Sequence, residues 1–598
     1  MNSPTIPQNT PTGQSEARQH AARAEFEPYR LKPRYDCNRS GVFYIGVKTD
    51  KDGETSEAPP LLLADPIRLI GRGIDETGNH YRIIEWRDKL THQTKQAALS
   101  AAEIGSNLGW QRLQSFGLSI MSGRAKRERL ADYLQTDGAQ TAYSVTTRAG
   151  WHGNTYILPS GEVIPAGNTD QKNKAAHVIY NGDRSQAAAY AVSGSLQEWN
   201  ARIGRYLAGN SRLCLAAGAA LAAPLVSLLG LEAGGFHLFG DSRDGKSTAA
   251  RLALSIWGDP AALMQTWTGT SHGFTNLANA RNDGLLVLDE IGQANPRHVA
   301  TTAYAVINGI SKVQGAKEGG NREGNRWKVM LFSTGEKPLE RFVEQGGDRW
   351  QAGQAARLPS VPSAAGKGLG IYDTLHGFPN GAAFSEALAA AASEQHGHAG
   401  RSFIRLLLDT PAAQDTAAHL LADFMQTLPE LSGQVRTVAL RFAATAAALE
   451  LAARHNIIAI PAGAGMVGIK QCFDDWLARN GTGKYEDARI VRQAADFMQL
   501  HAGSQRFSDW DNRQDSTDRE HAGYRRRLTT EEADEFWIST PVFEVEICQS
   551  YDTDKVCTVL HGIGWLKRNE TEKRWQYKKR NAGRFYVLIG IDPPEQAT

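Results

Sequence analysis

The sequence predicts a multidomain α/β protein whose central part is a parallel sheet flanked by helices. The chain has 598 residues, which exceeds what one hydrophobic core organises and indicates three or four domains. Between about residues 195 and 350, apolar strands alternate with helical segments, and a glycine-rich loop follows the first of these strands. That alternation is typical of a parallel sheet with helices on its faces. Alanine-rich segments with helical spacing follow at 380–460 and predict an all-helical lid.

Composition shifts and turn-rich stretches divide the chain further. The N-terminal part carries strand patterns at 42–47, 81–86 and 151–158, whereas the polar stretch at 507–527 reads as a loop. The last part reads as helix, turn, helix and two strands, which is the order of a winged helix. The expected parts are a polar arm at 1–30, a small β-rich or α+β domain at 31–165, the P-loop core at 190–375, the helical lid at 376–465, a helical linker region at 466–538 and a winged-helix domain at 539–598.

Bulk composition favours a folded protein of a reducing compartment. Hydrophobic residues make up 41% and charged residues 22%, and the net charge of +2 is too small to indicate a nucleic-acid partner by itself. The five cysteines form no CxxC pair, and the N-terminus has no apolar signal region, so we expect a cytoplasmic protein. Leu213–Leu231 is uncharged and nearly long enough to cross a bilayer. Pro224 and the many Ala and Gly residues favour a helix buried against the sheet instead.

A complete phosphate-binding motif lies in the segment FHLFGDSRDGKST, between a short apolar strand and a helical segment. The glycines let backbone N–H groups close around phosphate oxygens. Lys246 would reach the terminal phosphates of ATP, and the Ser247 hydroxyl would ligate Mg²⁺. The alternative interpretation is a mere glycine turn. The residues expected to bind ATP are Gly240, Asp241, Ser242, Arg243, Asp244, Gly245, Lys246, Ser247 and Thr248.

An acidic pair follows the apolar strand Leu285–Leu288. We expect Asp289 to hold the Mg²⁺ together with Ser247, and Glu290 to polarise the water that attacks the γ-phosphate. An Asp–Glu pair alone is a weak signal. Its place after the phosphate-binding motif, at the end of a buried strand, favours nucleotide hydrolysis over nucleotide binding alone.

Three further positions are candidates for completing a hydrolytic site. Thr334, at the end of the strand Lys328–Phe332, would orient the attacking water, or would only cap the following turn. Arg357 would reach the γ-phosphate of a neighbouring subunit, or is a surface arginine. Arg436 or Arg441, on a later helix, would be a second sensor of the nucleotide, with a solvated helix charge as the alternative.

Two regions combine positive charge with features suited to nucleic acid. The segment SKVQGAKEGGNREGNRW predicts a glycine-tipped β-hairpin that could grip a phosphate backbone, although a solvated charged loop is the usual alternative. Its cations are Lys312, Lys317, Arg322 and Arg326. Near the C-terminus, Lys578, Lys579 and Arg580 lie among aromatic residues and suggest duplex binding by the winged helix. A protein-contact role is the alternative there.

Several of these motifs together resemble one known family. The segments FGDSRDGKST, LLVLDEIGQ, YAVINGISKVQGA, FSTGE and GQAARLPSVP are similar to the bacterial family catalogued as domain of unknown function 927, over about residues 35–400. Its members look like AAA+ helicases of prophages, plasmids and other mobile elements, and some are similar to minichromosome maintenance helicases. The resemblance implies an AAA+ core, a homo-hexameric ring and a DNA strand in the ring's channel.

The resemblance also assigns roles residue by residue. It implies nucleotide roles for Lys246, Asp289 and Glu290, and a channel role for the hairpin that carries Lys317. Thr334 departs from the family pattern, because the better-known helicases more often have Asn there. Some relatives carry a primase module, but this chain has no zinc-binding cysteine cluster, so a separate primase or loader is implied.

Two functions remain open on the sequence. One is a DNA helicase that translocates at the origin of a mobile element. The other is an ATP-switched DNA-binding initiator or regulator that never translocates. Both need the same ATP site, and the basic hairpin separates them, because only a motor must hold it in a central channel.

Overall fold

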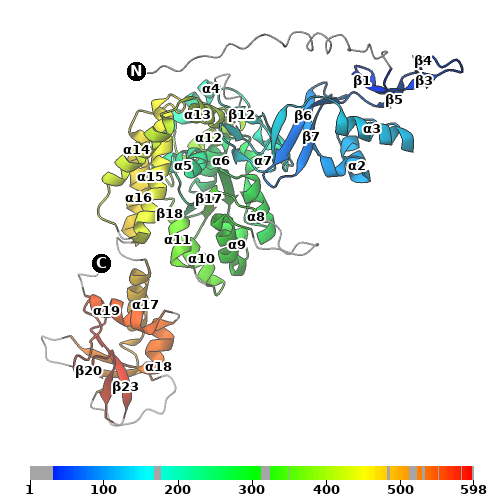
Figure 1. Cartoon of the computed structure of the whole chain (residues 1–598). Coiled ribbons are helices and arrows are strands. Elements are labelled where there is room, and N and C mark those ends of the chain that lie inside the picture. The colour runs from blue at the N-terminus through cyan, green and yellow to red at the C-terminus, as the bar shows by residue number, and fades with distance from the viewer. Residues whose placement is uncertain are drawn as a thin grey trace, which may run out of the picture. The chain divides into compact units, whose positions relative to one another are not determined.

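The computed structural model describes residues 31–167, 177–311, 324–348, 350–431, 433–480, 485–510, 521–527, 533–549, 551–580 and 582–594. The chain divides into two compact units. Figure 1 labels their helices and strands and colours the chain from blue at the N-terminus to red at the C-terminus. Residues up to 146 together with 176–181 form the first unit, and residues 147–175 with 182–598 form the second. The expected multidomain α/β architecture with a parallel sheet is therefore confirmed.

The first unit is an α+β body. Its elements are β1 (Arg34–Asn38), β2 (Gly41–Ile45), β3 (Val47–Thr49), β4 (Thr55–Glu57), β5 (Leu61–Ala64), β6 (Arg68–Asp75), β7 (His80–Arg87), β8 (Thr94–Ser100), α2 (Asn107–Ser115), α3 (Arg124–Thr136), β9 (Ala142–Thr146) and β13 (His177–Tyr180). The main sheet has the order β13-β9-β6-β7-β8, and a smaller sheet has the order β1-β2-β5. One apolar cluster joins both sheets to the two helices, through buried residues such as Leu63, Ile84, Trp110 and Leu130.

The strand β13 closes the first unit from a distance in sequence. It pairs in parallel with β9, so that His177 lies opposite Tyr143 and Tyr180 opposite Thr146. Residues 147–175, which separate these two strands along the chain, belong to the second unit. The chain therefore leaves the first unit and returns to it before leaving again.

The second unit is organised by a five-stranded parallel sheet. Its strands are β14 (Gly234–Phe239), β15 (Gln265–Thr266), β16 (Gly284–Asp289), β17 (Val329–Gly335) and β18 (Ser360–Pro362), in the order β15-β16-β17-β14-β18. Helices around it are α4 (Leu196–Arg202), α5 (Ser211–Leu228), α6 (Lys246–Ser255), α7 (Pro260–Leu263), α8 (Ser271–Ala280), α9 (Pro296–Asn308), α10 (Leu339–Gln345) and α11 (Ala352–Arg357).

Helices cover both faces of this sheet because its central strands are apolar on both sides. Leu285 and Met330 belong to the large core cluster that includes α5 and α6. Their neighbours Leu286 and Leu331 belong to a second cluster, which includes α8, α9 and α10. Near-continuous burial along a strand is what a parallel sheet between two helical layers requires.

The helix α5 is the buried helix that the sequence predicted. It is long and apolar enough to cross a membrane, with a mean hydropathy of 1.6, yet 89% of it is buried inside the protein. Pro224 interrupts its hydrogen bonding, because proline has no N–H to offer the carbonyl of Ala220. The indole N–H of Trp257 donates to that carbonyl at 3.1 Å instead. The proline is thus accommodated without an unpaired buried carbonyl.

Residues 376–480 are helical, but they do not form a separate body. Their helices are α12 (Gly381–Glu394), α13 (His398–Asp409), α14 (Ala413–Gln426), α15 (Gly433–Arg454) and α16 (Ala464–Asn480). Helices α15 and α16 pack directly on α5, and all share its core cluster. The segment expected to form the helical lid, 376–465, is thus helical and packs on the core of the second unit. Small residues such as Ala443 and Ala447 on α15 allow this close packing.

The boundary expected at residue 165 also differs from the structure. The small sheet β10 (Gly150–Trp151), β11 (Thr155–Ile157) and β12 (Val163–Pro165) belongs to the second unit, not to the N-terminal domain. Trp151 donates its indole N–H to the carbonyl of Pro224 at 2.8 Å, and the Tyr156 hydroxyl donates to the carbonyl of Asp283 at 2.9 Å. These long-range contacts decide which body the strands join, and a local strand pattern carries no information about them.

The C-terminal part begins earlier than residue 539. It comprises α17 (Tyr485–His501), β19 (Phe507–Asp509), β20 (Gly523–Arg526), β21 (Glu535–Ser539), α18 (Thr540–Val542), a π-helical segment (Phe543–Cys548), α19 (Thr553–Gly562), β22 (Tyr577–Lys579) and β23 (Gly583–Ile589). Its sheet has the order β19-β20-β21-β23-β22. The expected linker region at 466–538 is therefore divided: α16 joins the core, whereas α17 and three strands join this sheet. The strands β19 and β20 are short and polar, which is why 507–527 reads as a loop.

Close packing between α5 and α15 predicts that a glycine-to-alanine substitution on α5 lowers the stability of the protein. A Cβ atom at Gly218 would lie 2.7 Å from Thr445 Cγ2 and 2.8 Å from the Thr445 carbonyl oxygen. We expect Gly218→Ala to destabilise the protein by about 1–3 kcal/mol through overpacking. Gly353→Ala is the matched control, since nothing lies within 4 Å of its Cβ position, and helix propensity should leave it neutral or up to about 1 kcal/mol more stable. Midpoints of chemical unfolding measure both, and equal shifts for the two variants would contradict this packing.

Candidate functional site

The loop between β14 and α6 holds the predicted phosphate-binding residues. Gly245 ends the loop with a left-handed φ of 94°, which glycine adopts without strain, and Arg243 has a φ of 67°. No side chain caps the N-terminus of α6. The N–H groups of Lys246 and Ser247 are therefore available to an anion, which the helix dipole also favours, whereas the N–H of Thr248 donates to the Gly245 carbonyl at 2.9 Å. Lys246 is buried, and its ammonium donates to the carbonyls of Gly240 at 2.8 Å and Asp241 at 2.5 Å.

Three neighbouring strands bring the other candidate residues to this loop. Because β14, β17 and β16 are parallel and adjacent, their carboxyl ends lie at one edge of the sheet. Asp289 ends β16, and the Ser247 hydroxyl lies 3.1–3.2 Å from its two carboxylate oxygens. Thr334, near the end of β17, also donates its hydroxyl to Asp289. The backbone N–H of Glu290 donates to the Thr334 hydroxyl at 2.9 Å. Ser247, Asp289, Glu290 and Thr334 therefore meet at one place.

Glu290 has an uncommon backbone conformation. Its φ of 56° is left-handed, which is uncommon for a residue other than glycine and occurs at active sites among other places. Its carboxylate accepts a hydrogen bond from the N–H of Gly292 at 3.2 Å, at the start of a short 3₁₀ turn. The side chain is only partly buried, so solvent reaches the carboxylate.

A buried polar chain that sequence reasoning missed supports this edge from inside. The ring of His237, on β14, lies with Nδ1 2.9 Å from the Ser333 hydroxyl and with Nε2 2.9 Å from the Lys337 carbonyl. The Trp267 indole N–H donates to the same Ser333 hydroxyl at 2.9 Å. These contacts tie β14, β17 and the end of β15 together directly beside Thr334. The signal in the sequence was a histidine inside an otherwise apolar strand.

A second missed element is the segment from Pro362 to Asp373, which we call the strap. Its Ser363 N–H donates to the Phe239 carbonyl at 2.6 Å, and the Ser363 hydroxyl donates to the Asp244 carboxylate at 3.0 Å. The N–H of Ile371 donates to the Asp244 carbonyl at 3.0 Å. Gly370 has a left-handed φ of 63°, and a Cβ atom there would lie 2.6 Å from the Asp244 carbonyl. The strap therefore lies against the phosphate-binding loop.

The arginines expected to complete the site lie elsewhere in the chain. Arg357 pairs with Glu232 at 2.9 Å, just before β14 begins and therefore at the opposite end of that strand from the loop. Arg441 is buried beside Gly234 at the same end, and burial lowers its pKa to about 10. Arg436 is exposed on the first turn of α15. The structure thus brings neither Arg436 nor Arg441 to the loop of the same chain.

The predicted basic hairpin is described only at its base. Ile310 and Arg326 form an antiparallel bridge, and the N–H of Ser311 donates to the Asn325 carbonyl at 2.9 Å. Trp327 anchors the returning arm, since its indole N–H donates to the Val306 carbonyl at 2.8 Å. The segment that follows α9 and the segment that precedes β17 therefore lie side by side, as the two arms of a hairpin require. Its other cations, Lys312, Lys317 and Arg322, lie outside the described residues.

The C-terminal basic residues differ in their surroundings. Lys578 and Arg580 are exposed. The ammonium of Lys579 instead lies 3.3 Å from the ring centre of Tyr524 and 4.2 Å from that of Trp510, and it donates to the Trp510 carbonyl at 3.2 Å. These aromatic rings engage Lys579 in cation–π contacts on the sheet. Lys578 and Arg580 are therefore the accessible members of the basic group.

Comparisons with known proteins show a similar fold over most of the chain and a family match over part of it. The solved structure described as SCCmec type IV Cch, an active helicase, is similar with a TM-score of 0.68 at 16% sequence identity, and the likeness covers 94% of this chain and 98% of that chain. At this identity the likeness shows a shared fold. Residues 34–326 match the family described as a domain of unknown function, DUF927. No curated protein matches the sequence.

The buried His237 predicts a pH dependence of stability. Burial lowers the pKa of His237 to about 4, so the folded protein holds this ring neutral while the unfolded chain takes up a proton near pH 6.5. The stability contributed by the neutral ring is complete above pH 6.5 and is lost as the pH falls toward 4, by up to roughly 3 kcal/mol. Unfolding free energies of the wild type and His237→Gln, measured at pH 7 and pH 5, should converge at the lower pH. Parallel profiles for the two proteins would rule out this histidine as the titrating group.

Proposed function

We propose that the protein is an Mg²⁺-dependent ATPase that drives a DNA helicase of a mobile genetic element. The observation that carries the ATPase proposal is the meeting of Ser247, Asp289 and Thr334 within hydrogen-bond distance, beside a loop whose helix has no side-chain cap. A serine hydroxyl and a strand-end carboxylate in contact are the two protein ligands that a P-loop NTPase uses for its metal ion. A purely structural turn gives no reason for that combination.

The loop residues have separate roles in this proposal. Backbone N–H groups of Asp241–Gly245 and of the first turn of α6 bind the phosphates, and Lys246 neutralises their charge from within the loop. Ser247 and Asp289 would hold Mg²⁺, which would offset the negative charge that develops on the phosphate oxygens. A hydroxyl, a carboxylate, phosphate oxygens and water form the oxygen donor set that Mg²⁺ prefers.

Glu290 supplies the hydrolytic function. Its carboxylate follows Asp289 directly and is partly exposed to solvent, so it can accept a proton from a water aligned with the γ-phosphate. Thr334 bonds both to the Asp289 carboxylate and to the Glu290 N–H. It therefore holds the metal ligand and the catalytic base in a fixed relation, which is the role we assign to it.

The helicase part of the proposal rests on the fold and on the hairpin. The likeness to a solved active helicase extends over nearly the whole chain, and the base of a hairpin rises between α9 and β17. In a ring of subunits, Lys317 and its neighbouring cations would line the channel and hold the phosphates of one strand. Arg357 lies about 20 Å from its own loop along β14, so it could act only on a neighbour's nucleotide.

The C-terminal part fits duplex binding. Apart from the two short strands β19 and β20, the order α17, β21, α18, α19, β22 and β23 resembles that of a winged helix, in which the final hairpin would be the wing. Lys578 and Arg580 are exposed on this hairpin and its turn. We propose that they contact the phosphate backbone of duplex DNA.

Variants of the ATP site provide the first test. Lys246→Ala should lose nucleotide binding, because the phosphates would lose the ammonium that the motif places against them. Glu290→Gln should bind ATP normally but hydrolyse it at least about a hundredfold more slowly, since the amide cannot accept the proton. Binding is measured with a fluorescent ATP analogue, and hydrolysis by phosphate release with and without single-stranded DNA.

Strand displacement on tailed duplexes, measured with the same preparations, separates the helicase from an ATP-switched DNA-binding regulator. A helicase displaces strands in the wild type and not in Glu290→Gln. Undiminished hydrolysis by Glu290→Gln would remove that residue from the role of base. ATP hydrolysis without displacement from either tail would contradict the helicase proposal while leaving the ATPase intact.

The C-terminal cations provide a second test with an internal control. Removing Lys578 and Arg580 together should weaken duplex binding and lower the slope of log affinity against log salt by about 2, one for each lost phosphate contact. Lys579→Ala should change that slope less, since its ammonium contacts Trp510 and Tyr524. Titrations of labelled duplex at several salt concentrations measure both, and an unchanged slope in the double variant would indicate a protein-contact surface.

A further inference from the structure

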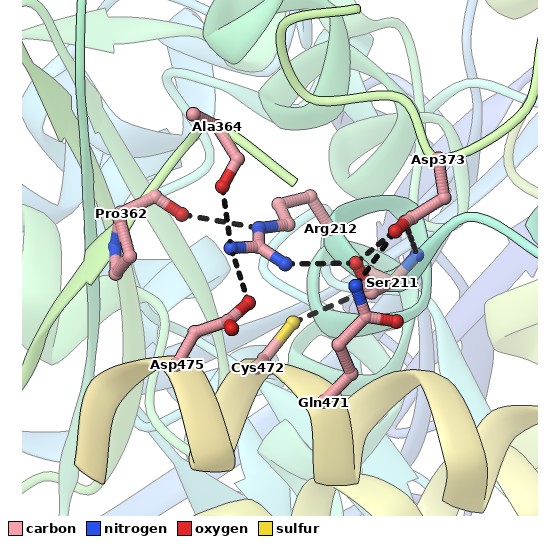
Figure 2. A network of polar contacts seen from close by, with 8 residues as sticks. All are labelled: Ser211, Arg212, Pro362, Ala364, Asp373, Gln471, Cys472 and Asp475. Carbon is pink, nitrogen blue, oxygen red and sulfur yellow. Dashed lines mark hydrogen bonds and ion pairs between the residues drawn. The ribbon is translucent and has the colours of Figure 1, made fainter. Parts of the chain in front are cut away.

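The strap is attached at both ends to two helices outside the phosphate-binding site. One end is held at Pro362 and Ala364, and the other at Asp373. The partners come from the N-terminus of α5 and from α16, as Figure 2 shows. Between these attachments the strap contacts Asp244 of the loop through Ser363 and Ile371.

Arg212 makes the first attachment. Its guanidinium is fully buried and donates from Nε to the Pro362 carbonyl at 3.0 Å and from Nη2 to the Ala364 carbonyl at 2.8 Å. The same Nη2 lies 2.7 Å from the carboxylate of Asp475 on α16. The planar guanidinium thus binds two strap carbonyls and one carboxylate at once, as Figure 2 shows, which the single ammonium of a lysine cannot reproduce.

Asp373 makes the second attachment. Its Oδ2 accepts hydrogen bonds from the N–H and the hydroxyl of Ser211, both at 2.7 Å, and its Oδ1 accepts from the Gln471 amide at 2.7 Å. The side-chain oxygen of Asn210 in turn accepts from the N–H groups of Asp373 and Thr374, at 2.9 and 3.1 Å. Asp373 thereby caps the first turn of α5. Both ends of the strap are therefore fixed to the same turn of one buried helix.

Arg212 is the residue of this network whose loss should disturb the strap most. A buried cation is stable only when its charge is paired and its donors are satisfied. Without Arg212, two strap carbonyls lose their donor, and the first half of the strap keeps only the pairing of β18 with β14 and the two hydrogen bonds of Ser363. The strap would then occupy several arrangements, of which only some support Asp244.

We propose that Arg212, held by Asp475, is a positioning residue for nucleotide binding: it fixes the strap that supports Asp244 of the phosphate-binding loop. This inference rests on the proposed ATPase function. Loss of Arg212 lowers the fraction of molecules whose loop is ready to bind, and apparent affinity falls in proportion to that fraction. The chemical step, once nucleotide is bound, uses none of these residues and is expected to continue.

Arg401 provides a matched control, because it makes the same kinds of contacts as Arg212 but lies away from the phosphate-binding loop. It is also buried, donates to the carbonyls of Tyr190, Trp257 and Gly397, and pairs with Glu162 at 2.6 Å. Trp257 lies beyond the C-terminal end of α6, whereas the loop precedes its N-terminal end. Arg401→Met should therefore cost comparable stability without reaching Asp244.

The experiment compares Arg212→Met with Arg401→Met in the full chain. Affinity for a fluorescent ATP analogue, kcat and KM for ATP hydrolysis, and the midpoint of thermal unfolding are measured for each. We expect Arg212→Met to weaken affinity and raise KM at least tenfold with kcat within about threefold of the wild type, and Arg401→Met to leave affinity and KM within about twofold. Similar nucleotide affinities for the two variants would overturn the proposal.

A milder variant covers the case in which Arg212→Met does not fold. The Asp475 side chain is 39% exposed, so Asp475→Asn should fold while depriving Arg212 of its counter-charge. It should weaken nucleotide affinity several-fold, and wild-type affinity would reject the proposal. If the wild type itself fails to bind the ATP analogue, the proposed ATPase function is rejected. If the wild type binds the analogue and the two arginine variants have similar affinities for it, only the proposed role of Arg212 is rejected.

Discussion

The register between three parallel strands is the constraint on which the candidate site depends. Leu238 of β14 lies opposite Thr334 of β17, and Ser333 of β17 lies opposite Leu288 of β16, so the glycine loop, the threonine and Asp289 emerge at one edge. A slip of one residue would turn Thr334 to the other face of the sheet. The buried chain of His237, Ser333 and Trp267 joins these strands beside that edge. It resists such a slip because each polar group would lose its partner.

The sequence carried enough information for the site and too little for its support. The strand, glycine loop and helix around Lys246, and the acidic pair after an apolar strand, are local patterns whose chemistry requires particular residue types at fixed spacing. Arg212 has no such pattern, because its importance comes from carbonyls about 150 residues away in sequence. The same reason explains why the sequence predicts 150–165 within the N-terminal domain and 466–538 as a linker region. The surfaces on which these segments pack are set by contacts that are not local.

Clusters of basic residues also illustrate a limit of reading charge from sequence. Lys578, Lys579 and Arg580 are consecutive, yet the middle one contacts aromatic rings while its neighbours are exposed. Alternation along β22 accounts for the difference between Lys578 and Lys579, since successive side chains point to opposite faces of the sheet, and Arg580 lies just beyond this strand. Arg357 and Arg441 come from the separate helices α11 and α15, and both lie at the end of β14 that is far from the phosphate-binding loop.

The return of the chain through β13 has a consequence for how the protein is made. The first unit cannot complete its main sheet when residue 146 leaves the ribosome, because β13 is still unsynthesised and β9 has an unpaired edge. An open strand edge invites pairing with other chains. Residues 147–175 must emerge before the sheet can close, so folding of the two units overlaps during translation. A gene fragment that stops at residue 146 would encode an unfinished sheet, whereas one that stops at residue 181 would complete this sheet but would separate residues 147–175 from the second unit.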